Sequence, residues 1–188
     1  MELEKPLGWD SHFHLASMAS RARLPVMDIT TVLECQPSDS DFAIKLEGGV
    51  AVFCDPKSAR EQEDNLWQLL YMLKGRVKPS QRIHLHCLTG DRETVDLLVT
   101  EFPNVCFGYT SLIASCSETT KEALRALDPS RLLLETDSPF FKAKGAKLGS
   151  PLHLRTMANA VARYRSESWQ EILQLACSNG KRLYAPSQ

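Results

Sequence analysis

Three apolar, strand-like runs of this chain each end in side chains that can bind a metal ion. The runs span residues 9–15, 82–90 and 132–139. The side chains that they carry are His12, His14, His86 and Asp137. In a (β/α) barrel, parallel strands bring their C-terminal ends to one rim, and active sites lie at that rim. The sequence therefore predicts a parallel sheet with a metal site at one edge.

The spacing of His12 and His14 supports this reading. In a β-strand, residues i and i+2 point to the same face, so both imidazoles project together, with Asp10 on the same side. Neutral imidazole suits zinc, manganese and other first-row divalent ions. A His-x-His pair alone is a weak signal, and it gains weight here from the other two runs.

Composition favours one intracellular domain. The chain has 188 residues, 43% of them hydrophobic, which is enough for a single domain over 1–188 with a substantial core. Its net charge of −1 gives no general attraction to nucleic acid, so any such binding needs a local patch. The sequence has no apolar run of membrane-spanning length, no signal-peptide pattern at its start and only scattered cysteines. We therefore expect a cytoplasmic or nuclear protein with reduced thiols and no membrane association.

Strand and helix patterns alternate along the chain. Strands are predicted over 7–15, 49–54, 82–88, 105–110 and 131–136, and helices over 57–74, 91–102, 117–127, 152–164 and 168–176. Residues 29–33 are rich in β-branched side chains and fit either a strand or a buried stub. Residues 16–25 give no clear assignment. The alternation predicts a parallel α/β architecture.

The motifs of the three runs resemble those of the TatD family of metal-dependent deoxyribonucleases, which belong to the amidohydrolase-like TIM-barrel group. They are Asp10-Ser11-His12-Phe13-His14-Leu15, His86-Cys87-Leu88-Thr89-Gly90 and Glu135-Thr136-Asp137-Ser138-Pro139. The similarity is greatest to vertebrate proteins with a C-terminal TatD domain, and residues 49–56 also fit that subgroup. The resemblance is continuous over 83–184. It implies a TIM-barrel-derived parallel sheet with outer helices, and hydrolysis of DNA phosphodiesters.

The resemblance also implies roles for individual residues. His12, His14 and Asp137 would bind a first metal ion, and His86 would bind a second together with another His. Asp137 would also take part in catalysis. Asp10 would be a carboxylate behind the ligands that orients a His. In the family, a glutamate from a Gly-Glu-x-Gly-Leu-Asp motif bridges the two ions.

The sequence departs from the family between Leu70 and Ile83. The family places further strands and helices there, with the bridging glutamate and the second His, whereas residues 71–82 contain neither residue type. Barrels of this type typically have about 250 residues. We therefore expect an internal deletion, about five strands instead of eight, and one divalent ion (Mg, Mn or Zn) rather than two.

Three readings of the activity stay open at this point. The chain is a weakened one-metal deoxyribonuclease, or a catalytically dead TatD-like fragment or splice form that acts only in binding or has no function. In the third reading, a residue such as Asp55 replaces the missing glutamate that bridges the two metal ions in the family.

Several other residues fit structural roles better than functional ones. His84 is expected to be packed or hydrogen-bonded, and Glu135 to alternate to the opposite face and form a salt bridge. His153 is expected at the surface, the cysteines in the core, and Lys142, Lys144 and Lys147 in a solvated loop.

Overall fold

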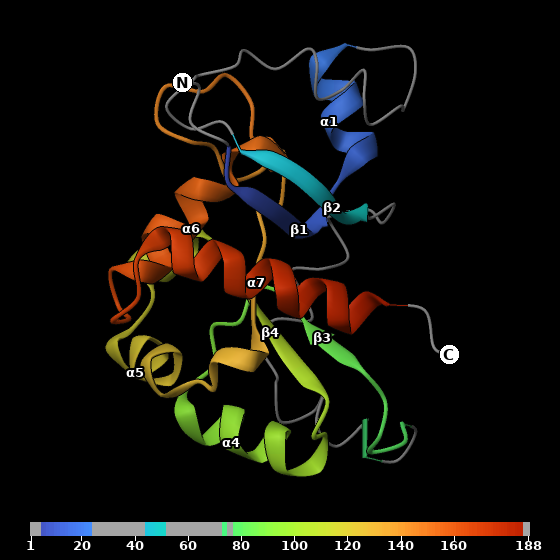
Figure 1. Ribbon diagram of the computed structural model, residues 1–188, viewed down its shortest axis with the longest axis vertical. Helices are drawn as coiled ribbons and strands as arrows, with labels where there is room; N and C mark the ends of the chain where they lie inside the picture. The colour runs from blue at the N-terminus through green and yellow to red at the C-terminus, as the bar shows by residue number, and fades with distance from the viewer. Residues whose placement is uncertain (1–4, 24–43, 52–72, 75–76, 186–188) are drawn as a thin grey trace.

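The computed structural model describes residues 5–23, 44–51, 73–74 and 77–185. Five strands in these ranges form two parallel sheets (Figure 1). In the first sheet, β1 (Leu7–Phe13) pairs with β2 (Lys45–Ala51). In the second, β4 (Val105–Tyr109) lies between β3 (Ile83–Leu85) and β5 (Leu132–Leu134). The predicted parallel α/β architecture is confirmed.

The two sheets meet where β1 and β5 end. Phe13 and Ser138 form a parallel bridge, and the His14 N–H donates to the Ser138 carbonyl over 2.7 Å. A second bond runs from the Asp137 N–H to the His12 carbonyl over 3.0 Å. The strands therefore follow the spatial order β2-β1-β5-β4-β3, and the join lies among the predicted ligands.

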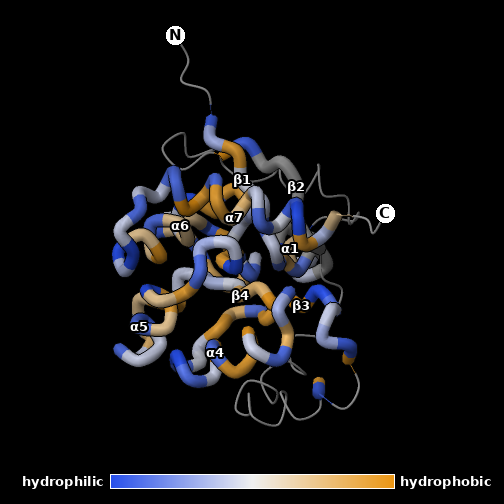
Figure 2. Tube along the Cα trace, turned by 60° about the horizontal axis from the view of Figure 1, so that its bottom comes forward, coloured by the Kyte–Doolittle hydropathy of each residue, from blue (hydrophilic) through white to orange (hydrophobic). Residues whose placement is uncertain are grey.

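The second sheet is formed by short, mainly apolar runs, with His84 at the centre of β3. Every residue of β4 and β5 is buried. Continuous apolar sequence is typical of parallel strands that are covered on both faces. Figure 2 shows these hydrophobic segments in the interior and hydrophilic segments on the outer helices. This burial is what fixes the ends of β3, β4 and β5 relative to one another.

Among the described residues, five helices with defined bounds surround the strands. They are α1 (Leu15–Ala22), α4 (Arg92–Glu101), α5 (Glu118–Ala126), α6 (Leu154–Ala162) and α7 (Trp169–Tyr184). Side-chain caps begin three of them, because Asp91, Ser117 and Ser168 each accept from a backbone N–H of the first turn. Short 3-10 turns lie at Ser111–Ser115, Pro129–Arg131 and Pro151–His153. None of the helices in the described ranges is long and apolar enough to cross a membrane.

Helix α7 connects the two sheets. It packs against β1, β5 and α6, and Figure 1 shows it crossing the middle of the molecule. It continues to Tyr184, past the predicted end at Ala176. Ser168 and Glu171 form a capping box at its start, in which each side chain accepts from the backbone of the other residue. The helix therefore begins at a defined residue and covers both sheets.

Some predicted boundaries differ from the structure. Residues 16–25 gave no assignment, and α1 (Leu15–Ala22) forms there, beginning at a Leu that was predicted to end the first strand. The strand predicted at 49–54 begins earlier, at Lys45, because this residue pairs with Leu7. The predicted strand or stub at 29–33 lies outside the described residues, as does the predicted helix at 57–74 except for 73–74, which are helical. That residues 1–188 form one domain stays a prediction.

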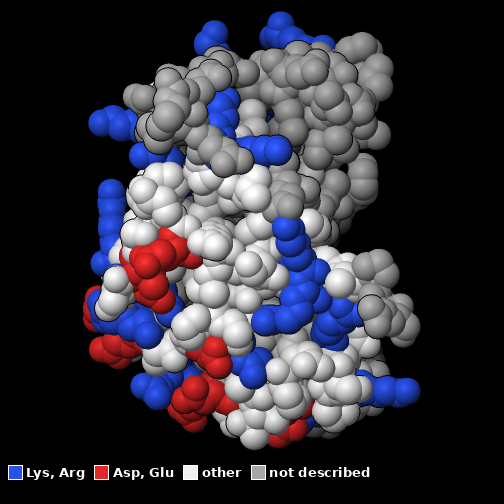
Figure 3. Space-filling model, in the orientation of Figure 1, with Lys and Arg blue, Asp and Glu red and all other residues white. Residues whose placement is uncertain are grey.

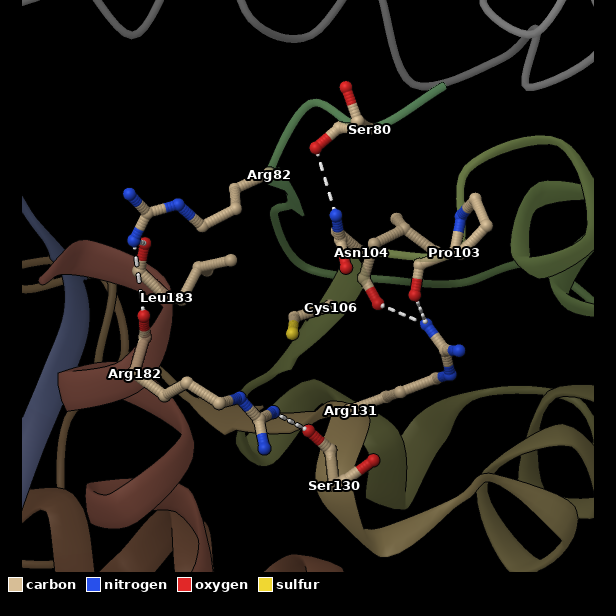
Figure 4. A pocket seen from close by; sticks show the side chains of 10 residues that line it. Ser80, Arg82, Pro103, Asn104, Cys106, Ser130, Arg131, Arg182 and Leu183 are labelled. Atoms are coloured by element: carbon tan, nitrogen blue, oxygen red, sulfur yellow. Dashed lines mark hydrogen bonds between the residues drawn. The ribbon is translucent and has the colours of Figure 1, made fainter. Parts of the chain in front are cut away.

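Arginines brace the N-terminal ends of the second sheet. A cavity of about 400 Å³ lies there, lined in part by Arg82, Arg131 and Arg182 (Figure 4). Each guanidinium donates to backbone carbonyls, among them Val105 O for Arg131 and Leu183 O for Arg82, both over 2.9 Å. In Figure 3, basic side chains gather near the C-terminal end of α7. We interpret these arginines as structural: their guanidinium groups satisfy backbone carbonyls where strands begin and where α7 ends. This end of the sheet is opposite the predicted ligands.

Candidate metal centre

The four predicted ligands lie at the C-terminal ends of three strands. His12 is in β1 and His14 follows its last residue, while His86 directly follows β3. Asp137 lies in the segment after β5. The shared parallel direction of the strands brings these ends to one edge, as the sequence suggested.

Three of these side chains form a tight group. The Asp137 Oδ1 atom lies 3.0 Å from His14 Nε2 and 3.6 Å from His12 Nε2. The two Nε2 atoms are 3.3 Å apart, and the three candidate ligand atoms all lie within 4.8 Å of one another. Two imidazole nitrogens and a carboxylate oxygen that converge in this way fit a divalent ion such as zinc, which commonly takes three protein ligands at catalytic sites.

Backbone conformation directs these side chains. Asp137 has a φ of 48° and Cys87, next to His86, has a φ of 50°. This left-handed region is uncommon for residues other than glycine, and Asp adopts it more easily than most. Both residues lie within a few positions of the end of a strand, so this backbone conformation helps to set the direction of the candidate ligands there.

His86 lies beside the group of three. Its Nε2 atom is 3.7 Å from Asp137 Oδ1, and its ring stacks on that of His12 with centroids 3.8 Å apart and planes 22° apart. The structure therefore brings His86 to the same carboxylate oxygen that His12 and His14 approach.

Asp10 supports the site through the main chain. It is fully buried and accepts from the backbone N–H groups of His12 (3.2 Å) and Thr136 (3.0 Å), and from the Thr136 hydroxyl. Its described contacts are thus with the backbone of a His and not with an imidazole ring. Burial raises the pKa of Asp10 to about 7, although its hydrogen bonds oppose that shift.

Burial also keeps His12 neutral. Desolvation and, next, the neighbouring His86 lower the pKa of His12 to about 4. Neutral imidazole is the form that binds metal. Near pH 7 the His12 ring is therefore ready to act as a ligand.

Glu135 contradicts the prediction from strand alternation. Its carboxylate is fully buried and forms ion pairs with His84 and with His86, whose Nδ1 lies 2.7 Å from Glu135 Oε2. Alternation fails because β5 ends at Leu134, so the strand geometry does not extend to Glu135. Burial raises the pKa of Glu135, but the two histidines outweigh this effect and hold the pKa below its usual range. The expected salt bridge exists, on the same side as the ligands.

A glycine makes room for this carboxylate. A methyl group at Gly108, in β4, would overlap the Glu135 carboxyl group and would lie 2.6 Å from His84 Nε2. A buried Glu in one apolar run and a glycine in the strand beside it were the sequence signals for this arrangement, but only the strand register relates the two.

Other expectations had mixed outcomes. His153 is buried, not at the surface, because the turn before α6 packs against β2 and α6. The three loop lysines are exposed as expected. Of the four described cysteines, Cys106 and Cys177 are buried, whereas Cys87 and Cys116 are half-buried. Asp55 lies outside the described residues.

A cluster of histidines and a carboxylate at the C-terminal edge of a parallel sheet is the arrangement found in metal-dependent hydrolases of barrel type. The chain belongs to the TatD family, because the profile described as "TatD related DNase" matches residues 58–185. This is a family of metal-dependent hydrolases and nucleases.

Named relatives include two nucleases. The human 3'-5' RNA nuclease TATDN2 is 29% identical over 153 residues, which cover 77% of this chain and 19% of that protein. The 3'-5' ssDNA/RNA exonuclease TatD of Edwardsiella piscicida is 31% identical over 110 residues, which cover 53% of this chain and 41% of that protein. The chain thus spans less than half the length of either relative.

Solved structures show the same fold. A TatD family hydrolase from Entamoeba histolytica superposes with a TM-score of 0.54 at 13% identity, covering 99% of this chain and 100% of that one. A TatD homologue from Escherichia coli K12 gives 0.52 at 17% identity, covering 95% and 76%. The barrel-derived parallel sheet with outer helices is therefore confirmed.

Proposed function

We propose that this chain hydrolyses phosphodiester bonds of nucleic acid with one divalent ion bound by His12, His14 and Asp137, and with His86 beside them. The observation that carries the proposal is the convergence of three ligand atoms within 4.8 Å at the strand ends. Relatives named as nucleases for RNA and for ssDNA/RNA support a nucleic-acid substrate. We propose DNA as the substrate on the motif resemblance, and RNA is the alternative that the assay separates.

The residues present suit this chemistry. A bound divalent ion polarises the phosphate and provides a nucleophilic water near neutral pH. The neutral His12 ring offers a lone pair without adding charge to the site. The Asp137 side chain is 15% exposed, whereas Asp10 and Glu135 are fully buried. Of these three carboxylates, Asp137 is the one that an attacking water could reach and to which it could give its proton.

The number of metal ions that we propose depends on which ligand residues the chain contains. The family block between about 70 and 83, with its bridging glutamate and second His, is proposed to be absent from this chain. Two divalent ions about 3.5–4 Å apart repel each other unless a carboxylate lies between them. We therefore propose one ion, chosen from Mg, Mn or Zn, and turnover well below that of a full-length relative.

The test is cleavage of single-stranded DNA and RNA in the presence of each metal. The Asp137→Asn chain should lose metal-dependent cleavage, while Asp96→Asn, which changes an exposed carboxylate on α4, should keep it. A folded wild-type chain that cuts neither substrate with any of the metals would contradict the proposal.

The second candidate is a TatD-like fragment or splice form that binds without catalysis, or has no function. The observation in its favour is that residues 71–82 hold neither the Glu nor the His that the family places there. A version with the family block grafted between Leu70 and Ile83 separates the candidates. Cleavage by the grafted chain alone favours the binding fragment, and equal turnover by both chains shows that the bridge is dispensable.

A further inference from the structure

Glu135 presents a physical problem that the proposed metal site does not explain. It is a carboxylate with no exposed surface, placed directly after a strand of three buried leucines. Burying a charge costs several kcal/mol unless the charge is paired and hydrogen-bonded. The surrounding structure must therefore supply partners for both oxygens, and the identity of those partners indicates what the group does.

The two oxygens have different partners. Oε1 pairs with His84 Nε2. Oε2 lies 2.7 Å from His86 Nδ1 and accepts the Cys87 N–H over 3.1 Å. The backbone of Cys87 and the ring of His86 are thus held by the same oxygen.

The His86 ring lies between two carboxylates. Its Nδ1 faces Glu135, and its Nε2 lies 3.7 Å from Asp137 Oδ1. The contact between Nδ1 and Oε2 is an ion pair, and a negative charge at this distance favours a proton on Nδ1. The other nitrogen, here Nε2, then keeps its lone pair directed at the metal cluster.

The contacts continue away from the cluster. His84 Nδ1 lies 2.6 Å from the Tyr184 hydroxyl, at the last residue of α7. The Tyr184 ring stacks on Trp9 of β1 with centroids 6.4 Å apart. The series Tyr184, His84, Glu135, His86 therefore runs from the end of α7 to the cluster.

The position of the carboxylate is fixed by the backbone around it. The Gly108 carbonyl accepts the Leu88 N–H over 2.9 Å, and Gly108 is in register with Leu133. A side chain at Gly108 would occupy the space of the Glu135 carboxyl group. The sheet thus leaves a gap that one buried carboxylate fills.

We infer that Glu135 is a positioning residue that holds His86 as the Nδ1–H tautomer, with Nε2 directed at the metal cluster, and that His84 and Tyr184 hold Glu135 from the other side. The inference rests on the proposed function, because orienting His86 matters only if the cluster binds a metal ion. The tautomer of His86 itself can be measured without metal.

The first measurement uses the metal-free wild-type chain. Nitrogen chemical shifts of the five histidines, with His86→Gln for assignment, report which ring nitrogen carries the proton. We expect Nδ1–H for His86. The Nε2–H tautomer in the folded wild-type chain would overturn the inference, whatever the nuclease assay gives.

The second measurement uses Glu135→Gln, with Glu118→Gln on the exposed side of α5 as the matched control. The Gln oxygen can take the place of Oε2 and still accept the Cys87 N–H, but it has no negative charge to hold a proton on Nδ1. The proportion of the Nδ1–H tautomer of His86 should therefore fall in Glu135→Gln, and the control should leave it unchanged. A folded Glu135→Gln chain with the same proportion of the two tautomers as wild type would overturn the inference.

A double-mutant cycle with zinc alone then separates positioning from general damage. Glu135→Gln should weaken zinc binding by about 10–100-fold, the range typical of groups that orient a ligand. In the His86→Ala background the same change should have less than about a twofold effect, because no ring remains to be oriented. An equal loss in both backgrounds would show a merely structural role.

The inference and the proposed function can fail separately. Zinc binding without cleavage, together with the expected tautomer, rejects the nuclease proposal and keeps the positioning role. Tyr184→Phe tests the far end of the series without a buried substitution, because Tyr184 is 37% exposed. We expect it to change the His84 nitrogen shifts, and unchanged shifts would remove Tyr184 from the inference.

Discussion

The backbone N–H of Asp137 donates to the carbonyl oxygen of His12 over 3.0 Å, so two proposed ligands that are far apart in the sequence are joined through the main chain. Their side chains then meet with Nε2 and Oδ1 3.6 Å apart. Placement of the ligands therefore depends on the pairing of β1 with the segment after β5, and not on side-chain reach. Changes that loosen this pairing should weaken the site even when every ligand is present.

Loss of one ligand should remove metal binding. His14→Ala removes the imidazole whose Nε2 atom lies 3.0 Å from Asp137 Oδ1, and it leaves two of the three converging ligand atoms. We expect zinc affinity to fall by more than about 100-fold, beyond the effect of an orienting group. Calorimetric titration with zinc measures this affinity. The control is His153→Gln, which changes a His outside the cluster. Equal affinity of the His14→Ala and wild-type chains would exclude His14 as a ligand.

Metal should stabilise the folded chain. A ligand that binds only the native state stabilises it by about 2.7 kcal/mol at a concentration 100 times its Kd. We expect zinc to raise the melting temperature and a chelator to reverse the increase, while the Asp137→Asn chain shows neither change. A zinc effect of equal size in Asp137→Asn would place the binding site elsewhere.

Truncating a buried side chain of β5, the strand before Asp137, should lower the stability of the folded chain. Leu134 is the last residue of β5 and is fully buried in the main core cluster, so Leu134→Ala should cost about 2–5 kcal/mol of unfolding free energy. Leu7, which is 44% exposed, is the matched control, and Leu7→Ala should stay within about 0.5 kcal/mol. Urea unfolding measures both, and equal costs would contradict the described packing.

Helix α7 should depend on its first residue. The Ser168 hydroxyl accepts the Glu171 N–H over 3.3 Å, and Glu171 Oε2 accepts the Ser168 N–H over 2.7 Å. Ser168→Ala should cost about 1 kcal/mol of unfolding free energy, while Ser168→Asp, which keeps an acceptor, should cost much less. The difference between the two variants in urea unfolding is the measure, and no difference would show that the cap is not used.

The cap of α4 should make stability depend on pH. Hydrogen bonds from the Thr94 N–H and hydroxyl lower the pKa of Asp91 below its ordinary value of about 3.9. A lowered folded-state pKa gives a contribution that is fully present above the unfolded pKa and is lost as pH falls through the folded pKa. The difference between the urea midpoints of wild type and Asp91→Ala should therefore be constant above about pH 4, shrink as the pH falls further, and vanish below the folded-state pKa of Asp91. A difference that stays the same at every pH would show that the ionised form is not required.

The sequence by itself determined the alternation of elements and the residues of the cluster. Apolar runs such as Leu132–Leu134 carry enough information for a buried parallel strand, because burial on both faces requires apolar side chains throughout. The His-x-His spacing and the strand-end position of Asp137, together with the motif resemblance, were enough to predict candidate ligands, and three of these side chains converge in the structure.

Tertiary structure decided what local periodicity could not. Glu135 approaches His86 because β5 ends one residue earlier, and the gap that it fills exists because Gly108 lies in the neighbouring strand. His153 is buried because a short turn packs against elements distant in sequence. Each of these outcomes depends on contacts between segments far apart in the chain, so the residues next to each position do not contain the information that fixes it.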